Sequence, residues 1–77
     1  MKFKVLDTVV LKRDVPENGL RKGDLGAVVE MLGPNRMEVE FVMASGRTQA
    51  LVTLSGRDIR PVGDDDLVAV RSVQHTA

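Results

Sequence analysis

The clearest hydrophobic pattern lies in the middle of the chain, where apolar and polar residues alternate over residues 37–41. Met37, Val39 and Phe41 occupy every second position, and Glu38 and Glu40 lie between them. Because successive side chains of a β-strand point to opposite faces, this spacing predicts a strand with one buried face and one wet face. The two glutamates are therefore expected on the wet face, and not as a catalytic pair of carboxylates.

Four further segments have the β-branched and apolar content of short strands, and turn residues separate them. They cover residues 8–12, 27–32, 48–54 and 59–62, with no helix-length amphipathic stripe between them. Residues 33–36 and 44–46 are expected to form hairpin turns, and residues 55–58 are a candidate for one helical turn. The pattern predicts an all-β fold, a small five-stranded antiparallel barrel of the SH3-like kind.

The inward positions of these strands should supply the hydrophobic core. The expected core residues are Val9, Leu11, Leu20, Val28, Val39, Phe41, Leu51, Val52, Leu54 and Ile59. The four methionines are expected to fill gaps and strand ends, because only Met37 lies on a clearly alternating face.

Two glycines, Gly23 and Gly26, bracket the residues before the second predicted strand. Glycine allows a positive φ or a close approach to a neighbouring strand, which a tight entry into a curved strand requires. We therefore predict structural turn roles for both. Since no helix follows them, a phosphate site at a helix N-terminus is not expected.

The composition indicates one domain followed by a tail. The chain has 77 residues, of which 43% are hydrophobic and none is cysteine, so stability must come from burial and backbone pairing. Gly63 and the acidic run Asp64–Asp66 are typical of a solvated break. We therefore expect a barrel domain over residues 1–62 and an acidic linker and tail over residues 63–77, whose apolar residues 67–73 could pair with a strand edge.

The charge balance bears on the class of partner. Eleven basic and eleven acidic residues cancel, which removes the general attraction to nucleic acid. A local excess of positive charge remains near the N-terminus, and it makes Lys12, Arg13, Arg21 and Lys22 the candidate binding surface.

Few residues of this chain are candidates for a catalytic or metal-ligating role. His75 is the only histidine, Ser45 and Ser55 have no base near them in sequence, and Asp64–Asp66 lack the spacing of a calcium loop. The absence of Trp and Tyr disfavours aromatic recognition of polyproline or of stacked bases. We expect no enzyme activity, no catalytic residues, no cofactor and no metal. No apolar run has the length of a signal peptide or a membrane span, so a cytoplasmic location is expected.

Several spaced elements occur in order along the chain: Asp7-x-Val9-x-Leu11, Gly19-Leu20, Lys22-Gly23-x-x-Gly26-x-Val28-Val29-Glu30, Val39-Glu40-Phe41, Gly46-Arg47-Thr48, Leu51 and Leu54. Together they resemble a bacterial family known as a domain of unknown function, number 4926. The resemblance implies an SH3-like barrel without assigned catalytic residues. Because some members lie beside genes for toxin-like proteins, it also implies an antitoxin or immunity-like role. The Lys22–Val28 run alone is similar to the start of the KOW motif.

Three functions follow as hypotheses. The leading one is a non-catalytic protein-binding module, with an antitoxin or immunity-like neutralising protein as one form, that uses barrel edges and loops. The alternative is a KOW-like module that binds RNA or the ribosome through the basic residues. The third is a homo-oligomeric structural protein, in which Val10, Val42 and residues 67–70 remain apolar and unpaired.

Overall fold

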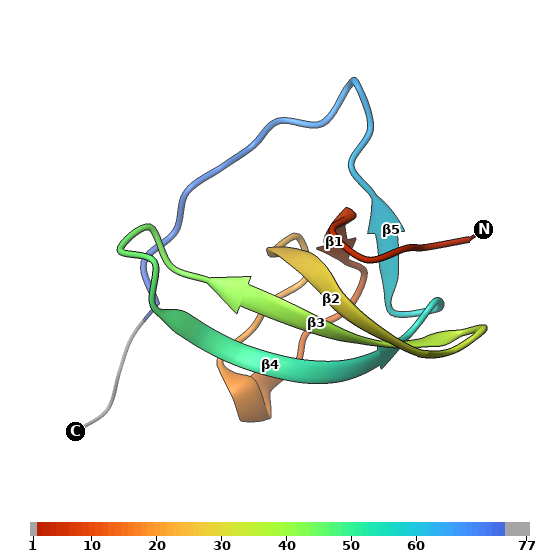
Figure 1. The fold of residues 1–77 in the computed structure, drawn as a ribbon. Helices are drawn as coiled ribbons and strands as arrows, with labels where there is room; N and C mark the ends of the chain where they lie inside the picture. Colours follow the sequence, from red (N-terminus) through yellow and green to blue (C-terminus); the bar gives the residue numbers. More distant parts are fainter. Residues whose placement is uncertain (1, 74–77) are drawn as a thin grey trace.

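The computed structural model describes residues 2–73 and forms a single antiparallel sheet (Figure 1). Its elements are β1 (Thr8–Leu11), the 3-10 helix η1 (Pro16–Asn18), β2 (Leu25–Gly33), β3 (Arg36–Val42), β4 (Thr48–Ser55) and β5 (Ile59–Pro61). The all-β prediction is confirmed, and each of the five predicted strands is present within one or two residues of its expected ends.

β2 is the central strand of the sheet, whose order is β4-β3-β2-β1-β5. Its first residues pair with β1, and the rest of it pairs with β3 through two register shifts. The sheet curves along β2, β3 and β4, as Figure 1 shows. Among residues 2–73 no pairing joins β4 to β5, so closure into an SH3-like barrel stays a prediction.

The two predicted hairpins are present. Pro34 and Asn35 form the turn between β2 and β3, and the Asn35 carbonyl accepts a hydrogen bond from the N–H of Gly56 at 3.2 Å. This bond ties the turn to the β4–β5 connection. The β3–β4 turn contains Gly46, whose φ of 92° explains the glycine there.

The loop between β1 and β2 is more ordered than its polar sequence predicts. It folds back on itself through paired backbone hydrogen bonds between Val15 and Leu20, of 3.0 and 3.1 Å, and both side chains are buried. The sequence analysis missed η1, which begins at Pro16 and ends at Asn18, and Gly19 follows it with a φ of 69°. Proline at the first helical position and a left-handed glycine after the last are the expected caps.

Gly23 and Gly26 differ in what they provide. Gly23 has a φ of 97°, in the left-handed region that side chains avoid. Gly26 lies in β2, where an added Cβ would lie 2.7 Å from a methyl group of Val39 and 2.8 Å from the ring of Phe41. At Gly26 the missing side chain therefore lets β2 pass directly against the core.

The core fills the inside of the curved sheet. Its buried members are Val9, Leu11, Val15, Leu20, Val28, Met37, Val39, Phe41, Ala50, Leu54 and Ile59. Val52 is half-buried against this cluster, as is Phe3, while Met37 is fully buried and so fills the core as predicted. Met1 lies outside the described residues.

The prediction that Leu51 belongs to the core is wrong, since its side chain is 56% exposed. Ala50, Val52 and Leu54 face inward, and strict alternation along β4 turns Leu51 outward. Val10 was expected to remain unpaired, but it pairs with both Leu25 and Arg60 and is buried.

Phe41→Ala should lower the free energy of unfolding by about 3 to 5 kcal/mol, because it leaves a cavity at the largest core side chain. Urea unfolding followed by circular dichroism measures the change. Val42→Ala is the control, since Val42 is the next residue but is half exposed. A Phe41→Ala variant as stable as the Val42→Ala variant would contradict this account of the core.

Gly26→Ala should destabilise the fold by about 1 to 3 kcal/mol, because the new methyl group overlaps Val39 and Phe41. Gly33→Ala, in the same strand, meets no atom within 4 Å and should leave the stability unchanged or raise it slightly. Thermal unfolding of both variants gives the comparison. Equal melting temperatures for the two would show that β2 does not need a glycine at the core.

Candidate functional site

After β5, residues 63–73, here called the tail, run back across the molecule toward the β1–β2 loop and the β3–β4 turn (Figure 1). Arg60 in β5 fixes the first part of the tail through two hydrogen bonds to the carboxylate of Asp66, of 2.8 and 3.0 Å. The backbone N–H of Gly63 donates to the same carboxylate at 2.6 Å, so this end of the tail is held at a turn.

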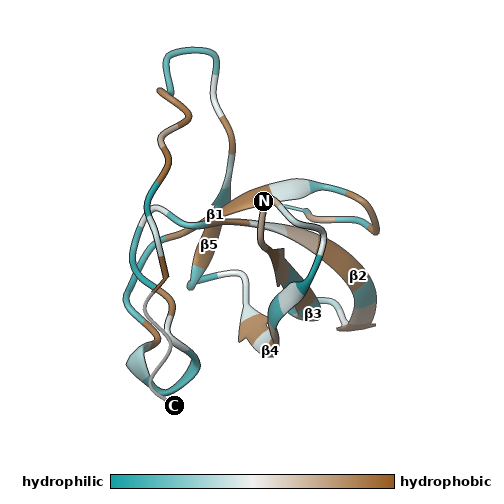
Figure 2. Ribbon diagram, turned by 90° about the vertical axis from the view of Figure 1, so that its left-hand side faces the viewer, coloured by the Kyte–Doolittle hydropathy of each residue, from teal (hydrophilic) through white to brown (hydrophobic). Residues whose placement is uncertain are grey.

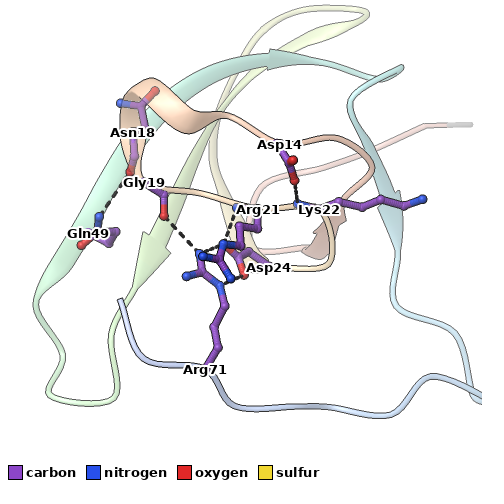
Figure 3. Close-up of polar contacts among 8 residues, drawn as sticks. All are labelled: Asp14, Asn18, Gly19, Arg21, Lys22, Asp24, Gln49 and Arg71. Atoms are coloured by element: carbon purple, nitrogen blue, oxygen red, sulfur yellow. Dashed lines mark hydrogen bonds and ion pairs between the residues drawn. The ribbon is translucent and has the colours of Figure 1, made fainter. Parts of the chain in front are cut away.

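Arg71 fixes the far end of the tail to the loop before β2 (Figure 3). Its guanidinium donates to both carboxylate oxygens of Asp24, at 2.9 and 2.5 Å, and to the carbonyl of Gly19 at 3.1 Å. Asp24 also accepts from the backbone N–H of Arg21 at 2.8 Å. The two side chains are 29% and 19% exposed, and bidentate pairing of this kind is among the stronger ion pairs.

The two carboxylates that hold the tail have low pKa values. Burial raises the pKa of Asp24, but the hydrogen bonds from Arg71 and from the Arg21 backbone lower it by more. The pKa of Asp24 therefore lies below the usual 3.8. The hydrogen bonds from Arg60 and from the Gly63 backbone lower the pKa of Asp66 to about 2. Both carboxylates are therefore ionised at neutral pH, and each is neutralised by its arginine.

A cavity of about 840 Å³ lies between the tail and the sheet, and we call it the tail groove. Val10, Leu25 and Val42 contribute to its floor, and Leu67–Val70 form its opposite side. The apolar stretch of the tail is drawn in brown in Figure 2. The volume lies within the range of about 300 to 1,000 Å³ that is typical of binding pockets.

The apolar residues along the groove remain open to solvent. Leu67 and Val70 are 95% and 97% exposed, and Val42 is 50% exposed. Leu67 and Val70 thus do not pack on the sheet, and two ion pairs hold this part of the tail over it. Contiguous exposed apolar surface of this kind marks interaction sites.

All four sequence-predicted basic residues lie in the β1–β2 loop, outside the tail groove, and all are exposed. Acidic groups lie among them. Arg13 pairs with Asp58 at 2.8 Å, and Asp14 accepts from the backbone N–H of Lys22 at 2.8 Å. Burial raises the pKa of Asp58, but the hydrogen bond from Arg13 and that from the Ser55 backbone bring it below 3.8. The loop therefore does not present an uninterrupted positive surface.

Three further polar residues that the sequence suggested as candidates make hydrogen bonds within the sheet and its turns. Glu38 and Glu40 accept hydrogen bonds from the hydroxyls of Thr53 and Thr48 on the neighbouring strand. Ser55 is the last residue of β4, and its backbone N–H donates to Asp58 at 2.9 Å.

No cluster of three or more potential metal-ligating side chains occurs among residues 2–73, and no helix in that part of the chain could span a membrane. Ser45 is an exposed residue at the edge of the tail groove, and His75 lies outside the described residues.

The sequence analysis missed both ion pairs that hold the tail. Asp24 and Arg71 lie 47 residues apart, and nothing in the local pattern of either residue indicates the other. The acidic run was expected to be a solvated break, whereas its last residue, Asp66, fixes the tail to β5. Residues 67–73 pair with no strand edge of this chain within the described residues.

The family model described as Domain of unknown function (DUF4926) matches residues 5–61, which is well over half of the chain. The chain belongs to the DUF4926 family. The match begins just before β1 and ends at the last residue of β5, so the tail of this DUF4926 domain lies outside the matched region. No curated protein matches the chain, and no solved structure does.

Arg71→Gln should release the far end of the tail, because an amide cannot replace the bidentate ion pair with Asp24. The ¹⁵N heteronuclear NOE of residues 67–73 should fall, while that of β1–β5 stays unchanged. Arg47→Gln is the control, since Arg47 lies in the exposed β3–β4 turn. A rigid tail in the Arg71→Gln variant would show that this ion pair does not hold it.

Acidification should free the Asp24 end of the tail before the Asp66 end. A carboxylate with a lowered pKa in the folded state stabilises that state above the unfolded pKa, and the contribution is lost as the pH falls through the folded value. The pKa of Asp66 is lowered to about 2, a larger shift than that of Asp24. NMR titration of the two carboxyl carbons tests this order, and the reverse order would refute it.

Proposed function

We propose that this chain is a non-catalytic protein-binding module, and that it takes an uncharged, apolar segment of a partner protein into the tail groove. The observation that carries the proposal is the exposure of Leu67 and Val70 in a tail that ion pairs fix at both ends. Holding apolar side chains in water is unfavourable, so their fixed display favours a surface that a partner covers.

The charges at the groove support an uncharged ligand. Arg60 and Arg71 stand at the two ends, but Asp66 and Asp24 already neutralise them. A charged segment entering the groove would lose hydration without gaining a free counter-ion. An apolar segment gains burial against the floor and the tail together.

The backbone of the tail supports an extended ligand. Within the described residues, no backbone hydrogen bond involves Leu67, Val68, Ala69 or Val70. Their N–H and C=O groups are therefore available to a partner strand, as in peptide recognition by β-strand addition. An antitoxin or immunity-like role is one form of this proposal, in which the bound segment belongs to the protein that is neutralised. We propose that this occurs in the cytoplasm, which suits a chain without cysteine.

The binding test begins with capture of partners from native lysate on the full chain, followed by titration of the purified partner. Leu25→Asp and Val42→Asp each place a charge on the groove floor and should weaken binding at least about tenfold. Leu32→Asp is the matched control, because Leu32 is exposed to a similar degree (47%) but lies outside the groove. Equal affinity for the Val42→Asp and Leu32→Asp variants would refute the groove as the binding site.

The RNA alternative predicts a different salt dependence. An apolar interface weakens little between about 50 and 200 mM salt, whereas contacts to several phosphates lose orders of magnitude in affinity over that range. Reversing the charges of Arg21 and Lys22 should leave the dissociation rate of a protein partner nearly unchanged. Tight binding to arbitrary RNA at physiological salt, abolished by that double substitution, would overturn the proposal in favour of RNA.

A further inference from the structure

The free edge of β4 is an unprotected strand edge. β4 is the longest edge strand, with eight residues, and it pairs only with β3 among the described strands. None of its residues, Thr48–Ser55, is charged or proline, and the register shift in its pairing with β3 lies at Gln49, near the start of the strand. Edge strands of isolated domains are usually kept short or carry charges, prolines or bulges that prevent pairing with another chain.

The opposite edge of the same sheet shows this protection. β5 has three residues, and two of them are Arg60 and Pro61. Proline cannot donate a hydrogen bond to an added strand, and a charge disfavours its approach. The contrast between the two edges indicates that the β4 edge, and not the β5 edge, pairs with another strand.

The outer face of β4 adds apolar contact area. The Leu51 side chain is more than half exposed there, opposite Glu40 of β3. At the start of the strand, Gln49 donates to the carbonyl of Asn18 at 3.2 Å, so the β1–β2 loop lies beside that end. The accessible part of the edge is therefore centred on Leu51–Thr53.

We propose that two copies of this chain associate through this edge, with their β4 strands antiparallel about a two-fold axis near Leu51–Thr53. The two five-stranded sheets would then form one continuous sheet. The centre of this interface, Leu51–Thr53, lies outside the tail groove, and the dimer does not depend on the proposed function.

A second copy fits the edge electrostatically. Two β4 strands bring no charges together, because neither has any. The nearest acidic residues on the outer face, Glu38 and Glu40, lie one strand back in each copy and accept hydrogen bonds from Thr53 and Thr48. Three strand spacings separate the two β3 strands that carry these glutamates, about 14 Å, which exceeds the Debye length of about 8 Å at physiological salt. The net charge of zero adds no long-range repulsion between copies.

The sheet topology also limits the assembly to two copies. Two-fold pairing uses the β4 edge of both chains and leaves only the β5 edges at the ends. Arg60 and Pro61 disfavour further addition there. A closed dimer is therefore expected, and not a fibre.

Sedimentation equilibrium of the full chain at several concentrations tests the dimer. We expect twice the mass of one chain for the natural sequence, and half that apparent mass for Leu51→Lys, which brings like charges together at the axis. Leu32→Lys, an exposed leucine on β2, should retain the dimer. A natural chain that is monomeric throughout, or a folded Leu51→Lys variant that remains a dimer, would overturn the proposal.

Spin labelling provides a second measurement that does not depend on how lysine affects folding. The chain has no cysteine, so Leu51→Cys and Leu32→Cys each accept a single nitroxide label. Dipolar coupling between copies should be strong at residue 51 and weaker at residue 32. Equal coupling at the two positions, or none at residue 51, would refute pairing through β4 even if a dimer is present.

Discussion

The sheet and its core are joined where β2 packs directly against the core at Gly26. β2 pairs with β1 on one side and with β3 on the other, so it joins the two halves of the sheet. At Gly26 its backbone lies where any side chain would overlap Val39 and Phe41. This close approach of β2 to Val39 and Phe41 lets the strands pack around one core. The chain has no cysteine, so no disulfide bond adds to that packing.

The molecule presents two surfaces with different physical character, the tail groove and the free edge of β4. The tail groove is maintained by charge, since the ion pairs Arg60–Asp66 and Arg71–Asp24 hold the tail across the sheet. The β4 edge is formed by backbone groups and uncharged side chains. We propose the first surface for an apolar segment of a partner protein and the second for an identical strand. Together the two proposals give a symmetric dimer that displays two grooves.

The basic loop illustrates how tertiary contacts change a charge pattern. In the sequence, Arg13 and Lys22 belong to an N-terminal region with excess positive charge. In the fold, Asp58 comes from the β4–β5 turn to pair with Arg13, and Asp14 caps the backbone of Lys22. The field of the loop is therefore smaller than the local sequence indicates, which lessens the support for nucleic acid binding.

The local sequence pattern was sufficient to predict the strands, both hairpin turns and most of the core, because alternation, β-branching and turn residues act over a few neighbouring positions. It did not determine which face of β4 is buried, since Leu51 and Val52 are both apolar and only packing against β3 selects the inward set. The tail groove arises from contacts between residues that are far apart in the sequence. Arg71 meets Asp24 across 47 residues, and an ion pair between distant residues leaves no periodic pattern in either local segment.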